Sequence, residues 1–519
     1  MNIRPGIARQ TGSTGSNGRA DVGLERILVA IVVCANAGVA AFVGMRGLGL
    51  PMLLAALLAL LLSAAGVLWL SRQLPETLDG LRSRRPWLST AWLLLSVVAL
   101  VQTTRLSLFM LDPTQAQYSL FPEDQWMVEH CCLTAYSESA RFTSEGEKNI
   151  YNETLYRGPD AAVDRGLRRK LGSFNVDPYH YPPTFLLLPL GVRTAVGGDF
   201  ELVRAVWFGM SALALMLAMG LIAYRLEPEG RLRAIGMAPL IWCSLPVLSG
   251  LQMSNVQILV VAISAIALAA FPRRAAVGGM LLAMSAVAKI FPGILFVYLV
   301  ARRKWREVAW TAGLAVGLTV LALVVVGPAP FQAFVQYELP RLSSGEAFSR
   351  PFTRVFAVSR NMAPFGIPLK LGWLGVPGMT LEVGRVVSMI YVLGVVGLAI
   401  WSGRRRPRTS TEAASVWLSL LSLGTLASPF APANYVLVSL VWLVCINREI
   451  FRPTAAVAIW VLISAPFLIS RDAPFLLQAI CYFPAQALAI GVPVVILWNA
   501  GMARVPEEVD EKGSVPVLA

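Results

Sequence analysis

The sequence predicts an all-α polytopic membrane protein, and three observations support this class. The 519 residues are 56% hydrophobic and only 14% charged, whereas soluble proteins carry about 25% charged residues. The mean hydropathy is +0.64. Apolar runs recur along the chain, and many are long enough to cross a bilayer as helices. We count about twelve to fourteen such spans.

The basic residues form short clusters between the apolar runs. Such clusters occur at 82–85, 302–306 and 404–406. Cytoplasmic loops of membrane proteins collect Lys and Arg in this way, so the net charge of +14 does not indicate nucleic-acid binding. The first apolar run, from Ile27, lacks a small-residue cleavage site and is followed by another span, so it is not a signal peptide.

The order of these runs divides the chain into four parts. The basic loop before residue 87 is predicted to be cytoplasmic, so the next span leaves the membrane on the opposite side. The parts are a disordered cytoplasmic N-terminus at 1–26, two additional N-terminal spans and a basic loop at 27–86, a main transmembrane domain at 87–500, and a polar tail at 501–519.

Two polar segments interrupt the main domain, at 112–180 and 328–380. The first holds many of the acidic residues and both histidines, and we predict a large extracytoplasmic loop that forms one wall of the active site. Within it, 125–144 is predicted to be a short helix on the membrane surface. The six cysteines are scattered, and neighbouring Cys131 and Cys132 are poorly placed for a disulfide. No metal-ligand spacing is visible.

Lys289 lies inside the apolar run 276–300. A lysine at the centre of a bilayer costs about 3 kcal/mol, so it normally faces a cavity and a partner. Pro292 and Gly293 follow and predict a break in the helix. An anionic phosphate is the partner that we predict, and snorkelling of the side chain to an interface is the alternative.

Tyr181-Pro182-Pro183 begins another apolar run. Proline at the first helical positions fixes the entry angle of the chain, and it holds the preceding residues extended. We therefore expect His180 and Tyr181 to lie beside a helix N-terminus, where anions are favoured. Asn255, at the start of a later run, either caps that helix or bonds to a neighbouring one.

Three stretches, in this order and spacing, resemble glycosyltransferase family 87 of the GT-C superfamily. The first contains Ala135-Tyr136 and leads to Tyr181–Leu190. The others are Gln252–Gln257 with Ala286–Pro292 and the basic cluster at 302–306, and then Ser428–Tyr435. Together they cover most of 100–450.

The resemblance implies a GT-C-type fold and an active site on the extracytoplasmic face of a bacterial plasma (inner) membrane. It implies a hexosyltransferase that inverts the anomeric centre. The expected donor is a polyprenyl-phosphate sugar, mannose or a related hexose, the acceptor is a glycan or glycolipid, and membrane lipids surround both. No cofactor is required, although a divalent ion assists some relatives.

In this family an Asp of the first outer loop acts as the general base. That role falls best on Asp112, at the outer end of a span, although an Asp there also makes turns with a following proline. Asp124 and Glu129 are rivals, because some members carry the acid just ahead of the Ala-Tyr stretch, where this chain has Cys131-Cys132. The predicted donor-phosphate and lipid residues are Lys289, His180, Tyr181 and Arg360; Asn255, Asn434 and Tyr435 are predicted to bind the acceptor or to be structural.

The main alternative is a secondary transporter or a flippase for lipid or polysaccharide. It predicts internal repeats with paired broken helices, and we see no repeat. A non-catalytic assembly protein of the cell envelope is a third reading. A transporter or flippase would also not need a large polar segment between early spans.

Overall fold

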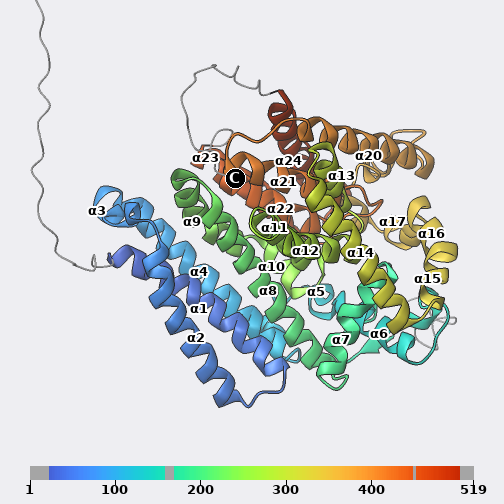
Figure 1. Cartoon of the computed structure of the whole chain (residues 1–519). Coiled ribbons are helices and arrows are strands. Elements are labelled where there is room, and N and C mark those ends of the chain that lie inside the picture. Colours follow the sequence, from blue (N-terminus) through green and yellow to red (C-terminus); the bar gives the residue numbers. More distant parts are fainter. Residues whose placement is uncertain (1–22, 158–168, 448–451, 503–519) are drawn as a thin grey trace, which may run out of the picture.

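The computed structural model describes residues 23–157, 169–447 and 452–502, and these residues form a multi-helix membrane protein (Figure 1). The predicted all-α polytopic class is confirmed. The one sheet in these ranges is a small antiparallel pair, β1 (Lys170–Leu171) and β2 (Phe174–Asn175). The predictions for 1–26 and 501–519 lie outside the described residues, except for a few positions at the ends of the first and last helices.

The N-terminal helices pack side by side at the left of Figure 1. They are α1 (Leu24–Gly47), α2 (Met52–Gln73), α3 (Leu81–Arg84) and α4 (Pro86–Leu111). Helix α1 packs on α2 and on α8 (Phe200–Arg225). Glycines permit this close approach, because a Cβ added to Gly209 of α8 would lie 2.7 Å from the Cα of Gly44 in α1.

Seven helices are long and apolar enough to span a membrane within the described ranges. They are α1, α2, α4, α8, α14 (Trp305–Val326), α20 (Leu381–Gly403) and α24 (Phe475–Met502). An eighth candidate is the pair α9 (Pro228–Cys243) and α10 (Leu245–Gln252), with a bend of 58°. The predicted count of twelve to fourteen is approached only when the shorter apolar helices are also counted as crossings.

Shorter helices pack among these long ones. They are α7 (Leu187–Ala195), α11 (Gln257–Ala270), α12 (Ala275–Ala288), α13 (Gly293–Ala301), α21 (Ser410–Thr425), α22 (Ala433–Ile446) and α23 (Pro453–Ser464). Helices α11, α12 and α22 have 14 residues each. At about 1.5 Å per residue they are too short to cross a bilayer core alone.

The first polar segment folds into short elements: α5 (Gln125–Glu129), α6 (Leu133–Ser144), η3 (Glu153–Tyr156), the two strands and η5 (Pro183–Leu186). The prediction of one surface helix over 125–144 is wrong. The chain breaks at 130–132 into two helices, and every residue of α6 from Leu133 to Ala140 is buried. Tyr136 packs against Trp207 of α8, which draws α6 into the interior.

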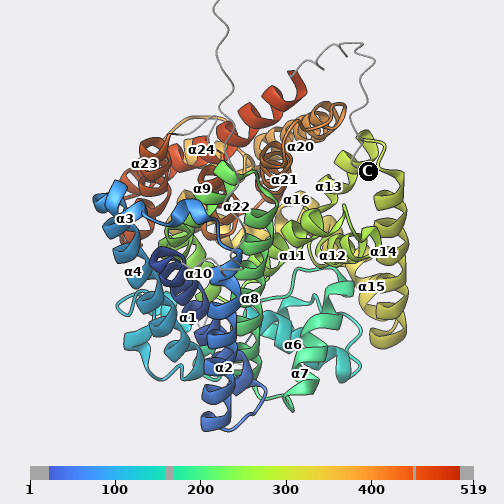
Figure 2. The same cartoon turned by 60° about the vertical axis from the view of Figure 1, so that its left-hand side comes forward.

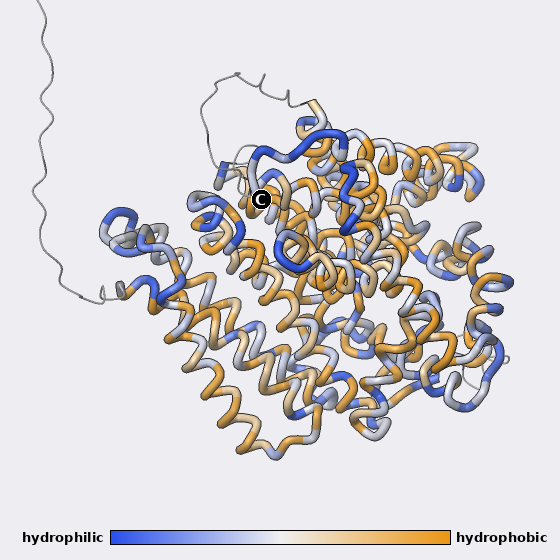
Figure 3. Tube along the Cα trace, viewed as in Figure 1, coloured by the Kyte–Doolittle hydropathy of each residue, from blue (hydrophilic) through white to orange (hydrophobic). Residues whose placement is uncertain are grey.

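The second polar segment carries α15 (Ala329–Ala333), η6 (Phe334–Glu338), α16 (Leu339–Ser344), α17 (Ser349–Phe352), α18 (Val355–Arg360) and α19 (Gly366–Trp373). In Figure 2, α15 lies at the end of α14 and on the same side of the molecule as α6. Hydrophobic residues dominate the helices in Figure 3, and hydrophilic stretches gather in the connections. The two polar segments thus form one cap over the helices.

Three chain breaks lie beneath this cap. They separate α10 from α11 at 253–256, α12 from α13 at 289–292, and α21 from α22 at 426–432. Backbone bonds join the cap to two of them: Cys132 N donates to Met253 O (2.8 Å), and Met362 N donates to Ala431 O (2.8 Å). Irregular backbone at membrane depth is stable where it lines a protein cavity.

Candidate functional site

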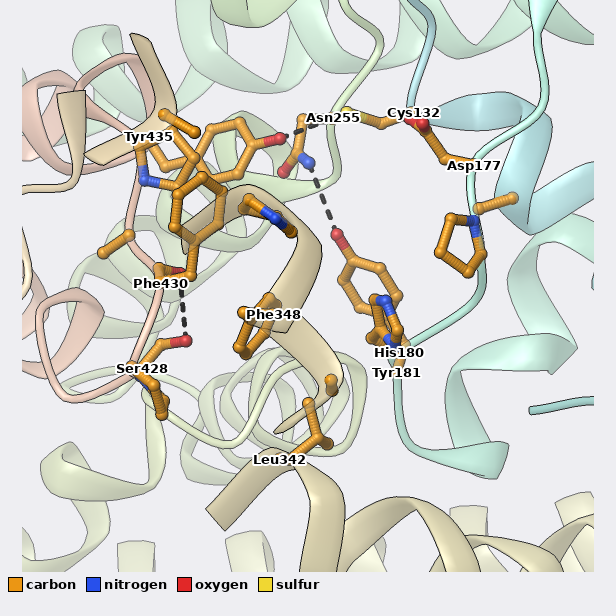
Figure 4. A pocket seen from close by; sticks show the side chains of 18 of the residues that line it. Cys132, Asp177, His180, Tyr181, Asn255, Leu342, Phe348, Ser428, Phe430 and Tyr435 are labelled. Carbon is orange, nitrogen blue, oxygen red and sulfur yellow. Dashed lines mark hydrogen bonds between the residues drawn. The ribbon is translucent and has the colours of Figure 1, made fainter. Parts of the chain in front are cut away.

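A cavity of about 960 Å³ lies between the cap and the three breaks (Figure 4). Its wall includes both histidines of the chain, which the polar cap supplies. The wall also includes all seven residues that were predicted to bind the donor, to bind the acceptor or to be structural. They are Lys289, His180, Tyr181, Arg360, Asn255, Asn434 and Tyr435. The structure therefore gathers residues that lie far apart in the sequence around one space.

Lys289 follows the last residue of α12 and lies at a helix end, not within one straight helix. Its Nζ donates to Gln257 Oε1 (2.9 Å) and Asn255 Oδ1 (3.3 Å). Nζ also lies 4.9 Å from the ring centroid of Tyr435 and 5.4 Å from that of Tyr181. In the described part of the chain it has no acidic partner. Neutral amides and aromatic faces solvate the ammonium and leave its charge available to an anion.

Two tyrosine side chains contact the break at 253–256 between α10 and α11. Tyr136 Oη donates to Tyr181 Oη (2.8 Å), and Asn255 Nδ2 donates to the same oxygen (3.3 Å). The proline doublet after Tyr181 starts η5 and orients the tyrosine toward the cavity (Figure 4). Asn434 lies with its Nδ2 3.2 Å from Met253 Sδ, which ties α22 to the break at 253–256.

His180 connects the two polar segments. Its Nδ1 lies 2.7 Å from Oε1 of fully buried Glu338. Arg341 donates to Glu338 Oε2 (3.1 Å) and also to Glu153 of the first segment. Burial opposes ionisation of Glu153, but Arg341 and Arg157 outweigh it and lower the pKa of this carboxyl. This network fixes the cap at the mouth of the cavity.

The three predicted bases are outside the cavity wall. Asp112 accepts from Thr114 N (3.0 Å), Thr114 Oγ1 (2.6 Å) and Gln115 Nε2 (3.1 Å), and these bonds lower its pKa. Asp124 caps α5 by accepting from Trp126 N (3.0 Å) and Met127 N (3.3 Å). Asp112 therefore stabilises a turn, and Asp124 stabilises the N-terminus of a helix.

Glu129 has a comparable structural environment. One oxygen lies 3.3 Å from Lys170 Nζ, and the other accepts from Asn175 Nδ2 (3.0 Å). These contacts join α5 to the two-stranded sheet.

Sequence reasoning missed a cluster that does line the cavity: His130, Cys132 and Asp177. Cys132 Sγ lies 3.6 Å from His130 Nε2 and 3.1 Å from Tyr435 Oη. His130 Nδ1 lies 3.3 Å from Asp177 Oδ2. One nitrogen, one sulfur and one oxygen fall within 4.8 Å of one another, a ligand set that also suits a zinc ion. Figure 4 shows Cys132 and Asp177 beside each other at the upper edge of the cavity.

A second cationic group lies on another part of the wall. The guanidinium of Arg360 lies 3.9 Å from the centroid of Phe356 and faces Tyr482 and Phe467 at 5.6 and 5.7 Å. Arg471 lies over the same Phe356 ring at 3.9 Å and pairs with Asp124 (3.1 Å). Arg360 is therefore separate from the aromatic group around Lys289, although both were predicted to bind the donor.

Two signals in the sequence point to the missed cluster. The chain has only two histidines, and both occur in the polar segment that was expected to be catalytic. Cys132 also occupies the place just before the Ala-Tyr stretch where some relatives carry an acid. No signal in the sequence pointed to Asp177, because its contact with His130 joins positions far apart in the chain.

Comparison with known proteins identifies a family match. Residues 179–429 match the model of Glycosyltransferase family 87. This range includes His180, Tyr181, Asn255, Lys289 and Arg360, and it starts after Cys132 and Asp177. No curated protein matches the chain.

One solved structure is similar: the crystal structure of ArnT from Cupriavidus metallidurans bound to undecaprenyl phosphate. The identity is 17% over 80% of this chain and 78% of that chain, with a TM-score of 0.30. At this TM-score the superposition supports no comparison of individual residues.

Proposed function

We propose that this chain is a membrane glycosyltransferase of the family 87 type, and that it takes a hexose from a polyprenyl-phosphate donor. The acceptor is a hydroxyl of a glycan or glycolipid, and the reaction takes place on the extracytoplasmic face. Family resemblance supports a mannose-like sugar. The observation that carries the proposal is the partly buried cation of Lys289, which faces a large cavity and has neutral hydrogen-bond partners.

The donor phosphate binds at Lys289. Ile290, the next residue, lines the same cavity and is 63% exposed on the apolar surface of the molecule. A lipid tail can therefore leave the cavity beside Ile290 and remain in the bilayer while its phosphate reaches Nζ. A buried cation near a leaving phosphate stabilises the charge that develops as the sugar–oxygen bond breaks.

The His130–Asp177 pair is the general base in this proposal. The Asp177 carboxylate beside Nδ1 favours the tautomer that carries its proton there, which leaves Nε2 to accept a proton. The acceptor oxygen attacks the anomeric carbon as its proton passes to Nε2. The bond to the phosphate oxygen breaks, and the electron pair stays on the polyprenyl phosphate. Attack opposite the leaving group inverts the anomeric centre.

The directions of three spans support the extracytoplasmic position. Helices α4 and α14 each start at a basic cluster and end at a polar segment, and α20 runs from a polar segment to the basic cluster at 404–406. The two polar segments consequently share one side of the membrane, opposite the basic loops. Basic loops favour the cytoplasm, and the cavity is then on the outer side of a bacterial plasma membrane.

Transfer of radiolabelled hexose tests this function directly. Purified protein in lipid nanodiscs is supplied with polyprenyl-phosphate [³H]mannose and a membrane extract that contains endogenous acceptors. We expect label in a glycan or glycolipid product with wild-type protein and none with Lys289→Met. Failure of a panel of polyprenyl-phosphate hexoses, with protein that binds polyprenyl phosphate normally, would reject the reaction. Failure to bind polyprenyl phosphate would reject the donor class.

A further inference from the structure

We propose that Arg360 and Arg471 form a second anion site in the cavity, and that this site binds a phosphate or carboxylate group of the acceptor. The inference rests on the proposed transferase function and specifies the chemical class of the acceptor: it carries a negative charge. Lys289 remains the site of the donor phosphate.

The first observation is a partly buried guanidinium without a counter-charge. Within the described residues the guanidinium of Arg360 has no hydrogen bond and no ion pair, and its Nε is buried. The groups packed around it are the rings of Phe356, Phe467 and Tyr482. An isolated buried charge is strongly unfavourable unless a counter-charge is present. Because the side chain lines the cavity, an anion from the cavity can supply that counter-charge.

The second observation is the neighbouring arginine. The guanidinium carbons of Arg360 and Arg471 each lie 3.9 Å from the centroid of Phe356, so they are at most twice that distance apart. Asp124 pairs with Arg471, and the neighbouring exposed Asp472 also acts on Arg471 electrostatically, whereas no ion pair reaches Arg360 in the described residues. Burial lowers the pKa of both, that of Arg471 to about 9, and a bound anion would raise it again. Two guanidinium forks suit an oxyanion, which they can bind through several hydrogen bonds.

The third observation relates this site to the chemistry. Arg471 lies 3.7 Å from the centroid of Trp126, and the ring of His130 stacks on the same tryptophan at 4.1 Å and 14°. The anion site is therefore one aromatic side chain away from the proposed base. From the base, contacts lead through Cys132 to the Tyr435 hydroxyl, and Lys289 lies over the Tyr435 ring. A donor phosphate at Lys289 and an acceptor anion at the arginines would bracket the reacting hydroxyl.

Inorganic phosphate provides the test, because it reports both sites. Protein in nanodiscs is first saturated with polyprenyl phosphate to occupy Lys289, and phosphate is then titrated and followed by calorimetry. We expect saturable phosphate binding that Arg360→Gln and Arg471→Gln each weaken at least tenfold. Arg306→Gln removes the same charge from an exposed position outside the cavity and should leave the binding unchanged. Displacement of all phosphate by polyprenyl phosphate, or wild-type affinity in Arg360→Gln, would overturn the second site.

A stability measurement separates this site from a structural arginine. Removal of this partly buried charge, which has no counter-charge, should leave the melting temperature of Arg360→Gln equal to or above that of the wild type without phosphate. The stabilisation that phosphate gives to the wild type should be absent from the variant. A variant that melts well below the wild type in the absence of phosphate would show that Arg360 has a structural role and would contradict the proposal.

Acceptor analogues test the source of the anion. Once transfer has been established, matched glycosides with and without a phosphodiester are compared. We expect the charged acceptor to have a KM at least tenfold lower, and Arg360→Gln to remove this difference with little change in kcat. Equal KM values for the two acceptors would overturn the acceptor assignment. Loss of all transfer with intact phosphate binding would instead count against the transferase function.

Discussion

Nζ of Lys289 lies 2.9 Å from the side-chain oxygen of Gln257, and Nζ of Lys370 lies 2.8 Å from the side-chain oxygen of Gln486. The two lysines have the same kind of neutral partner, but only Lys289 lines the large cavity. Lys370 is fully buried, whereas Lys289 is partly exposed to the cavity, so the pair separates the effect of an amide-bonded lysine on folding from its effect on the donor.

We predict that Lys289→Met lowers kcat/KM at least 100-fold, in line with the loss of about 3 kcal/mol when one donor to a developing oxyanion is removed. Polyprenyl-phosphate affinity should fall as well, because the same cation binds the phosphate of substrate and product. Single-turnover transfer and ligand binding measure the two effects. Lys370→Met is the control, with transfer unchanged in the folded fraction. Similar losses in both variants would indicate a general effect on folding.

Asp177→Asn should reduce kcat by about 10²- to 10⁴-fold, the usual contribution of general-base catalysis. The loss arises because the amide no longer stabilises a protonated His130. The rate is measured with saturating donor. Asp112→Asn is the matched control and should retain wild-type kcat, because that carboxylate bonds only to its own turn. The reverse order of effects would return the base to Asp112.

The thiol of Cys132 permits a rescue experiment. Cys132 Sγ lines the cavity and lies 3.6 Å from His130 Nε2, at a place where some relatives carry an acid. We expect the double variant Cys132→Asp, Asp177→Asn to be at least tenfold more active than Asp177→Asn alone, because it has a new carboxylate beside the same cavity. Cys132→Ser, which adds no charge, should give no rescue. Equal behaviour of the Asp and Ser double variants would argue against a carboxylate at this place.

Chelation distinguishes two uses of the His130–Cys132–Asp177 cluster. If the histidine is a base oriented by the aspartate, incubation with EDTA followed by gel filtration leaves transfer unchanged. Metal analysis of the purified protein then finds less than one ion per chain. Loss of transfer on chelation, with recovery on addition of zinc, would show that the cluster binds an ion and that its imidazole is a ligand.

The ion pairs at the mouth of the cavity predict a pH-dependent stability. Glu153 has a pKa below its usual value because of Arg341 and Arg157. Its ionised form therefore stabilises the folded protein above the unfolded pKa of about 4.3. This stabilisation is lost as the pH falls through the lower pKa of the folded state. Glu153→Gln should therefore lower the melting temperature at pH 7, by the equivalent of about 1 kcal/mol, and the difference should shrink below pH of about 4. Glu346→Gln removes another acid beside Arg341, but this one is 66% exposed and should have little effect.

The sequence was a good guide to the fold class and a partial guide to the site. Hydropathy predicts the long spans directly, because each must bury its own backbone hydrogen bonds in lipid. Unusual residues in apolar surroundings, such as Lys289 and the proline doublet after Tyr181, predicted parts of the cavity wall. Lys289 and Tyr181 stand out because a charge or a broken helix at membrane depth is unfavourable without a cavity.

The acidic residues could not be assigned in the same way. In the polar cap a carboxylate is unremarkable, and its role depends on which element lies across from it. Asp112 bonds within its own turn. Asp124 and Glu129 also form ion pairs with residues far along the chain, as Asp177 does with His130. Such contacts depend on the path of the chain from 130 to 177, which the residue pattern does not specify.

The close packing of α1 on α8 links the two additional N-terminal spans to the helix that supports the cap. Gly44 and Gly209 bring the two backbones together, and a Cβ at Gly47 would meet the backbone nitrogen of Val206 at 2.6 Å. Helix α8 also carries Trp207, against which Tyr136 of the cap is packed. A bulky side chain at Gly209 would push the helices apart and tilt the element that supports the tyrosines, so an alteration far from the cavity would change its shape.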